Sequence, residues 1–279
     1  MSLRKLPEIR ADHRLGAAQF DMRPDALERW EPEVRAAGGS DNAISIYDAI
    51  GDNWEGTGVT AKRISAALRS IGQQDVVVNV NSPGGDFFEG VAIYNLLREH
   101  KAKVTVQVMG LAASAASVIA MAGDEILMGD GAFLMIHNAW AVAIGNRHDM
   151  ADAASRLEPF DAAMARVYAD RAGIPVAEAA RMMDQETWIG ASDAVEGGFA
   201  DGLLAGDSVV KDAKASGGRK ALALVEAAMA QAGHSRSMRR DTLKSLFSGT
   251  PSAAGAATPR AGSEDAALLQ TLLRTITTR

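Results

Sequence analysis

Gly110-Leu-Ala-Ala-Ser114-Ala-Ala-Ser117 is a run of small residues between two apolar segments, and it decides the fold that we predict for this chain. The preceding residues 103–109 alternate apolar and polar side chains, which is typical of a half-buried strand. Residues 118–122 are all apolar and predict a buried helix that ends at Gly123. Ser114 therefore falls at a turn between a strand and a helix.

A turn of this kind suits a nucleophilic serine. The first N–H groups of a helix have no partner within the helix, and they can stabilise a developing negative charge. The alternative is that the small residues only allow two helices to pack closely and that Ser114 has no chemical role. Residues elsewhere in the chain have to decide between the two interpretations.

The composition is that of an ordinary globular protein. The chain has 279 residues, of which 47% are hydrophobic and 23% charged, enough for one large domain. No run of 18 apolar residues predicts a transmembrane helix, and Met1–Pro7 lacks the apolar stretch of a secretory signal. The chain has no cysteine, which excludes disulfides, thiolate metal sites and a cysteine nucleophile and suits a cytoplasmic protein.

Charge and histidine spacing exclude further classes. A net charge of −6 and an isoelectric point near 5.4 argue against a dedicated nucleic-acid binder. The histidines show no metal-ligand spacing such as His-Glu-x-x-His; they are His13, His100, His137, His148 and His234. We therefore expect no metal, no cofactor, and neither nucleic acid nor membrane as a partner.

Strand and helix patterns alternate through the middle of the chain. Strands are predicted at 43–50, 75–80, 103–109, 124–128 and 132–136, and helices at 24–37, 60–70, 87–100, 149–172, 175–183 and 192–196, with one or two more in 219–247. Thr60 and Asp86 are the expected N-caps of two of them. Pro159 should kink or interrupt the long helix. The alternation predicts an α/β fold with a parallel or mixed sheet covered by helices.

Composition divides the chain into four segments. We predict an N-terminal arm at 1–41, a main domain at 42–205 and a helical extension at 206–248. Residues 249–279 are a predicted flexible linker rich in Gly, Ala, Ser and Pro, followed by a short amphipathic helix.

Three features that suit acyl-transfer chemistry follow one another along the chain. They are Ser114, His137 at the end of a predicted strand, and the acidic residues Asp184 and Glu186. A serine hydroxyl is a weak nucleophile that needs a neutral imidazole to accept its proton and a carboxylate to fix the imidazole tautomer. Taken singly, the histidine is more often structural and the acids more often solvated. Their joint occurrence favours a catalytic site.

The turn Asn81-Ser-Pro-Gly-Gly85 adds a place for the oxyanion. Proline fixes one dihedral angle, and the two glycines permit close approaches that a side chain would block. The backbone N–H groups of Gly85 and of Ala115 are therefore candidates for stabilising the charge on an attacked carbonyl oxygen.

Four motifs of this chain resemble the ClpP family of serine peptidases, and most of all its phage branch, the ClpP-like head maturation (prohead) proteases. The motifs are Asn81–Gly85, Gly110–Ala115, Met135–Asn138 and Glu186–Asp201. Their order makes the resemblance specific, and it covers about residues 42–205. It implies a ClpP/crotonase-type fold of repeated ββα units that assembles into homo-oligomeric rings, here through the helix at 149–172.

The same resemblance implies roles for the residues of the first three motifs. Ser114 is the implied nucleophile and His137 the general base, with the N–H groups of Gly85 and Ala115 as oxyanion donors. Gly84 and Gly85 would also line the cleft, to which the substrate peptide adds as an extended strand.

The third member of the triad is the least certain assignment. In the family it lies two residues before the aromatic residue that opens the last motif, which here is Glu186 before Trp188. ClpP itself usually has aspartate at this position, so Asp184 stays an alternative.

The sequence thus predicts a serine endopeptidase, encoded by a phage or prophage, that cleaves scaffold or capsid polypeptides in the host cytoplasm. The alternatives are a crotonase-like acyl-CoA hydratase or isomerase, a Ser–Lys peptidase of the signal-peptide-peptidase type, and a catalytically inactive ring-forming structural protein. Labelling by a fluorophosphonate would favour the peptidase, and tight binding of coenzyme A would favour the acyl-CoA enzyme.

Overall fold

The structure is a computed structural model that describes residues 19–20, 22–53, 56, 58–212 and 218–248. The chain divides into two compact units, Met1–Thr242 and Leu243–Arg279. Of the second unit only residues 243–248 are described, so the predicted linker and short helix within 249–279 lie outside the described residues.

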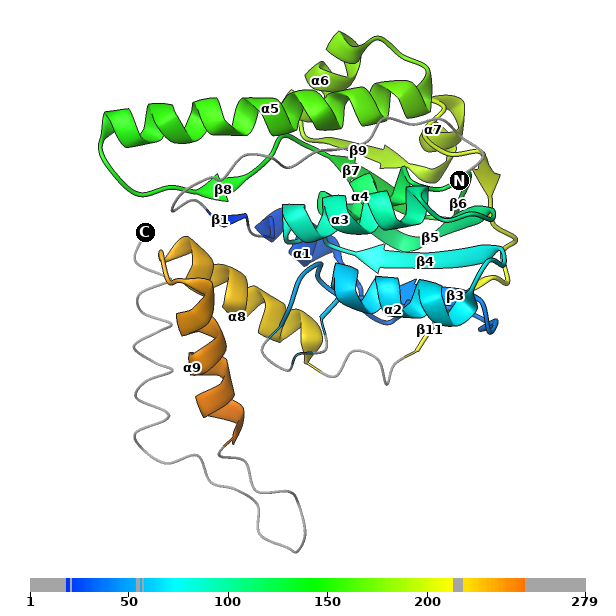
Figure 1. The fold of residues 1–279 in the computed structure, drawn as a ribbon, viewed down its shortest axis with the longest axis horizontal. Coiled ribbons are helices and arrows are strands. Elements are labelled where there is room, and N and C mark those ends of the chain that lie inside the picture. Colours follow the sequence, from blue (N-terminus) through cyan, green and yellow to red (C-terminus); the bar gives the residue numbers. More distant parts are fainter. Residues whose placement is uncertain (1–18, 21, 54–55, 57, 213–217, 249–279) are drawn as a thin grey trace, which may run out of the picture. The chain divides into compact units, whose positions relative to one another are not determined.

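A seven-stranded sheet forms the centre of the first unit (Figure 1). Its strands are β3 (Ala43–Ile46), β4 (Val76–Ser82), β5 (Val104–Ala113), β6 (Glu125–Met128), β7 (Phe133–Ile136), β9 (Thr187–Gly190) and β10 (Gly202–Leu203). The order is β10-β6-β5-β4-β3, with β7 beside the second half of β5 and β9 beside β7. All neighbours are parallel except β7 and β9.

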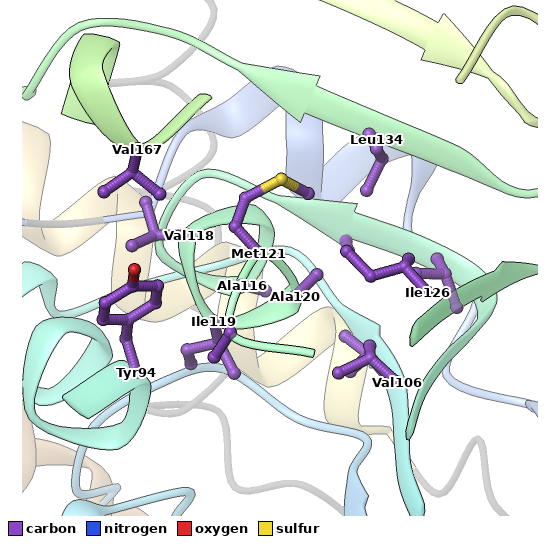
Figure 2. Packing of buried hydrophobic residues seen from close by; sticks show 14 of the residues in the cluster. Tyr94, Val106, Ala116, Val118, Ile119, Ala120, Met121, Ile126, Leu134 and Val167 are labelled. Atoms are coloured by element: carbon purple, nitrogen blue, oxygen red, sulfur yellow. The ribbon is translucent and has the colours of Figure 1, made fainter. Parts of the chain in front are cut away.

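Six helices contribute to the core on one face of this sheet. They are α2 (Ala61–Ile71), α3 (Phe87–Arg98), α4 (Ala115–Ala120), α5 (Arg147–Ala172), α6 (Val176–Asp184) and α7 (Ala191–Glu196). Every residue of the short helix α4 is buried. Figure 2 shows its side chains surrounded by Tyr94 of α3, Val106 of β5, Leu134 of β7 and Val167 of α5. The alternation of strands and helices confirms the predicted α/β fold.

The opposite face of the sheet carries a second hydrophobic cluster. Successive residues of a strand point to opposite faces, so Ala112 of β5 lies in the first cluster while Leu111 and Ala113 lie in the second. Two helices complete this second cluster, α1 (Pro24–Arg29) and α8 (Arg219–Gln231). Segments before and after the predicted main domain are therefore packed on the same face.

Short strand pairs add to this arrangement. β2 (Val34–Ala36) pairs antiparallel with β11 (Val209–Lys211), and β1 (Gln19–Phe20) pairs antiparallel with β8 (Ala141–Val142). The last described helix is α9 (Arg236–Ser248). No helix of the described chain is long and apolar enough to cross a membrane.

Both predicted N-caps are confirmed. The Thr60 hydroxyl accepts the N–H of Arg63 at 3.4 Å, and the Asp86 carboxylate accepts the N–H of Glu89 at 3.1 Å. A polar side chain before the first helical turn thus satisfies an amide that has no partner within the helix.

Two predicted elements were too long. The helix predicted at 24–37 ends at Arg29, because Val34–Ala36 instead forms a strand whose partner β11 lies far along the sequence. The strand predicted at 43–50 ends at Ile46. Ile50 makes an isolated bridge to Gly85 instead, which draws the following segment toward the glycine turn.

Of the predicted kink or interruption at Pro159, the interruption was wrong. α5 continues through this proline from Arg147 to Ala172. A proline within a helix leaves the carbonyl group four residues earlier without its N–H partner. Here that residue is Ser155, and both Ser155 and Pro159 are exposed, so water can satisfy the carbonyl group.

Candidate active site

The topology of the sheet brings three predicted site segments to one edge. β4, β5 and β7 are parallel neighbours, with Ser82 opposite Ala112 and Ala113 opposite Met135. Their carboxyl ends therefore meet, as in other α/β sheets that bind ligands at this edge. The glycine turn follows β4, Ser114 follows β5, and His137 follows β7.

Glu186, which directly precedes β9, lies at the same edge because β9 runs antiparallel to β7. Thr187 pairs with Ile136, so the next residues outward in register are Glu186 and His137. The backbone thus places these two residues side by side at the strand ends, although they are far apart in the sequence.

Ser114 has a strained backbone at the turn between β5 and α4. Its φ is 55° and its ψ is −124°, and the side chain is half-buried. The Ser114 N–H donates to the Met135 carbonyl at 3.0 Å, while the Ser117 hydroxyl donates to the Ser114 carbonyl at 2.6 Å. Non-glycine residues with positive φ cost about 1–3 kcal/mol and cluster at active sites. Strained turns from a strand to a helix present the nucleophile in α/β-hydrolases.

The glycine turn packs directly against this serine. Gly84 has a φ of 89°, and a Cβ atom there would lie 2.6 Å from the Ala113 carbonyl oxygen and 2.7 Å from the Ser114 Cβ. Gly85 has a φ of 144°, and a Cβ atom there would lie 2.3 Å from the Ile50 carbonyl oxygen. Only glycine allows the backbone to come this close at either position.

Two backbone N–H groups remain available beside Ser114. Ile50 bonds to the residues on either side of Gly85, donating to the Gly84 carbonyl at 2.8 Å and accepting the Asp86 N–H at 2.9 Å. In such a ladder the N–H of the intervening residue points to the other side. Among the described residues, none accepts a hydrogen bond from the N–H of Gly85 or Ala115.

One small cavity unites four of the predicted site residues. Ser114, His137, Gly85 and Ala115 line it together with Phe87, Asn138, Ala139, Trp140 and Met164. Its volume is about 20 Å³, which is space for roughly one water molecule. Gly84 does not line this cavity but packs behind Ser114.

His137 is buried and uncharged at neutral pH. Its side chain is 6% exposed. Burial and, second to it, the nearby Arg23 lower the pKa of His137 to about 4, against the opposite effect of Asp25. A neutral imidazole has the free lone pair that a general base needs.

The structure does not bring either predicted carboxylate to His137. Both oxygens of Glu186 bind the guanidinium group of Arg23, with Nη2 and Oε2 2.7 Å apart. Arg23 Nε in turn lies 2.9 Å from the Asp25 carboxylate. Asp184 instead accepts a hydrogen bond of 2.7 Å from the Asn138 side chain. Glu186 has a φ of 52°, and it shares a positive φ with Ser114 alone among the described non-glycine residues.

Sequence reasoning missed Arg23 and Asp25. Proline at position 24 followed by an acidic residue is a local signal for a helix start, and α1 does begin there. No local pattern indicates that Arg23 reaches a carboxylate 163 positions later.

Asp161 of α5 is a further group that the sequence did not single out. Its carboxylate accepts the N–H of Ala139 at 2.6 Å and so fixes the loop that follows His137. Burial, with smaller contributions from the nearby Asp184 and Glu158, raises the pKa of Asp161 to about 6, and the Ala139 hydrogen bond opposes this rise.

A larger cavity lies away from this site. It measures about 650 Å³ and is lined by Arg29, Leu111, Phe133 and Trp188 among others, but not by Ser114 or His137. Within the described ranges, no group of three or more His, Cys, Asp or Glu side chains is arranged to hold a metal ion.

Comparison with known proteins agrees with this geometry. Residues 38–207 match the family described as Clp protease. The ATP-dependent Clp protease proteolytic subunit of Streptococcus salivarius is 31% identical over 177 residues, which cover 61% of this chain and 87% of that protein. The corresponding subunit of Leuconostoc citreum is 32% identical over 135 residues, covering 47% of this chain and 68% of that protein. The corresponding subunit of Pleurastrum terricola is 31% identical over 130 residues, which cover 46% of this chain and 66% of that protein.

Proposed function

The chain belongs to the Clp protease family, and from this premise we propose that it is a serine-type endopeptidase whose nucleophile is Ser114 and whose general base is His137. The observation that carries the proposal is the small cavity in which a strained serine, a neutral histidine and two unpaired backbone amides meet. These are the groups that acyl transfer to serine requires.

Each group has a role in the proposed reaction. The Ser114 Oγ attacks the carbonyl carbon of the scissile peptide bond while His137 accepts its proton. The N–H groups of Gly85 and Ala115 hold the negative oxygen of the tetrahedral intermediate, and each such donor contributes on the order of 3 kcal/mol. His137 then protonates the leaving amine, and a water molecule releases the acyl group from Ser114 by the reverse sequence.

We assign the third role to Glu186 rather than to Asp184. The register of β7 and β9 supports Glu186, since the last paired residues, Ile136 and Thr187, directly adjoin His137 and Glu186 along the chain. Asp184 is tied to Asn138 at the end of α6. A carboxylate that bonds to the histidine ring fixes the tautomer and stabilises the imidazolium ion that forms. Glu186 has to leave Arg23 to take this role.

The proposed substrate is a polypeptide that binds as an extended strand at the glycine turn. The four motifs that resemble ClpP-like prohead proteases support a more specific task, the cleavage of scaffold or capsid proteins during phage head maturation in the host cytoplasm. The same resemblance supports assembly into a homo-oligomeric ring. The division into an arm (1–41), a peptidase domain (42–205), a helical extension (206–248) and a tail (249–279) is part of this proposal.

The Ser114→Ala variant tests the function. Peptide cleavage and labelling by a fluorophosphonate should both be lost, while thermal unfolding stays within a few degrees of the wild type, since one oxygen atom is removed from a half-buried side chain. Mass spectra of both proteins after incubation also report self-cleavage and its site. Cleavage by the variant at the parental rate would show that the nucleophile is assigned wrongly.

A further inference from the structure

The segment that precedes the peptidase core is docked across the edge where the site residues meet. Its described part, residues 19–20 and 22–30, is called the strap below. Leu27 and Trp30 are fully buried in the second hydrophobic cluster, and the Trp30 ring nitrogen donates to the Asn81 carbonyl at 3.0 Å. The α8 helix braces α1 from outside, where Lys220 Nζ donates to the Glu28 carbonyl at 2.5 Å.

The first part of the strap pairs with the strand that follows His137. Phe20 lies opposite Ala141 and Gln19 opposite Val142, in an antiparallel ladder of β1 with β8. Trp140, directly before β8, lines the cavity that contains Ser114. A peptide that adds to a sheet edge makes the same backbone hydrogen bonds as a strand. β1 therefore covers an edge of β8, directly after a residue that lines the Ser114 cavity, at which another strand would otherwise add.

The next part of the strap reaches the glycine turn. Met22 lines a second cavity, of about 40 Å³, together with Ile50 and Gly85. Because Gly85 also lines the cavity that contains Ser114, the strap borders the turn that carries a predicted oxyanion donor.

Arg23 binds the carboxylate of Glu186, the proposed partner of His137. Its two terminal nitrogens engage both oxygens of Glu186, and the planar guanidinium group matches a carboxylate in this bidentate way. Arg23 is only 17% exposed, and Asp25 holds its Nε, so the guanidinium group is fixed in this orientation.

We propose that the strap is an autoinhibitory element, in which β1 fills the substrate position along β8 and Arg23 holds Glu186 away from His137. The inference rests on the proposed peptidase function and adds its regulation. Displacement of the strap frees the strand edge and the Glu186 carboxylate together, so substrate binding and assembly of the triad become one event.

The first test removes the ion pair between Arg23 and Glu186. Arg23→Ala should raise the kcat for a fluorogenic peptide by about three- to tenfold, the range expected for losing a partly exposed bidentate ion pair. Arg23→Lys keeps the positive charge but loses the planar guanidinium group that binds both carboxylate oxygens. Its kcat should therefore lie between that of Arg23→Ala and that of the wild type. Arg69→Ala is the matched control, since Arg69 is an exposed arginine that bonds to Ser65 in its own helix; its kcat should not change.

The second test weakens the β1–β8 ladder. The double variant Gln19→Pro/Phe20→Pro removes the N–H groups of both β1 residues, one of which faces β8 in the antiparallel ladder. It should lower KM several-fold with little change in kcat, because it opens the strand edge and leaves Arg23 in place. Thermal unfolding of all variants identifies any that fail to fold.

The outcomes separate the two proposals. If Ser114-dependent cleavage occurs but neither the Arg23 variants nor the proline variant increases it, the strap is not inhibitory while the peptidase function stands. A fall in kcat in Arg23→Ala would make Arg23 a residue that positions Glu186 for catalysis, and it would also overturn the inhibition. If no folded variant cleaves peptides or reacts with a fluorophosphonate, both proposals are wrong.

Discussion

At the scale of single residues, two acidic side chains compete for the role beside His137. In the Arg23→Ala background, we expect Glu186→Gln to lower kcat by roughly a thousandfold, because an amide cannot stabilise the imidazolium ion that forms during attack. Asp184→Asn is the matched control, since the new amide oxygen can still accept from Asn138. Steady-state kinetics with a fluorogenic peptide measure both. A larger loss in Asp184→Asn would assign the role to Asp184.

The pKa of His137 predicts the shape of the pH profile. Only the neutral ring can accept the Ser114 proton, so kcat/KM falls as pH decreases through this pKa. Burial and then Arg23 lower the pKa of His137 to about 4. Removal of the Arg23 cation makes protonation of the His137 ring easier, so the pKa of His137 rises. The fall of kcat/KM at acidic pH should therefore occur at higher pH in Arg23→Ala than in the wild type. Profiles measured between about pH 4 and pH 8 test this, with Arg69→Ala expected to follow the wild type. A fall that occurs at lower pH than in the wild type contradicts the assigned effect of Arg23.

The sequence predicts some of these residues and not others for a physical reason. Ser114 and His137 each end a strand with a clear apolar pattern, and parallel strands deliver their ends to one edge. Arg23 reaches Glu186 only because α1 docks on the second face of the sheet. This docking depends on contacts with β5, β7 and α8, which no local pattern around residue 23 contains.

At the scale of elements, the glycine turn is fixed by its distance from the start of α4. We expect Gly84→Ala to lower kcat/KM by about a hundredfold or more, because the added methyl group would overlap the Ala113 carbonyl and the Ser114 Cβ and move the nucleophile. Gly131→Ala is the control. Gly131 also has a positive φ, of 72°, but no atom lies within 4 Å of an added Cβ.

The comparison of these two glycines separates clash from backbone strain. An alanine at positive φ destabilises the folded state by about 1 kcal/mol. Both variants should therefore have a slightly lower unfolding temperature than the wild type. Activity should fall in Gly84→Ala only. Equal losses of kcat/KM in the two variants would show that strain alone accounts for the effect and that contact with Ser114 does not matter.

Periodicity predicted the long elements and missed the shortest strands. β4, β5 and α3 have apolar patterns of seven or more residues and were found within a few positions. β1, β8 and β11 have two or three residues each. They exist because a distant partner supplies their hydrogen bonds, and a pattern of two or three residues is too short to carry a period.

At the scale of the whole molecule, the segments outside the family resemblance lie close to the site. Arg236 in α9 lies 2.5 Å from the Asp86 carboxylate, and Arg240 lies 3.1 Å from that of Asp52. Asp86 directly follows the glycine turn and caps α3. The arm and the extension therefore contact the turn that carries a predicted oxyanion donor. The sequence predicted both as separate segments, since it contains no signal that two chain regions so far apart pack on one sheet face.

Within the described chain the first half of α5 is mostly exposed, and Leu157 packs only partly buried against the first hydrophobic cluster. From residue 147 to residue 159 every side chain is exposed except those of Ala153 and Leu157, which are half-buried. Helices of this length gain most of their stability from packing of an apolar face. Met150, Ala153 and Leu157 have the spacing of one such face. In the proposed ring, a second copy of the chain would cover it.

We therefore expect the double variant Met150→Asp/Leu157→Asp to prevent assembly. Two charges on the proposed contact face would have to be buried without partners, which costs several kcal/mol per interface. The molar mass from light scattering should fall from that of a ring to that of a single chain, and peptide cleavage should fall with it. Ser155→Asp adds a charge on the opposite side of the same helix and should leave both quantities unchanged. A double variant that keeps the wild-type mass would exclude this face of α5 from the assembly.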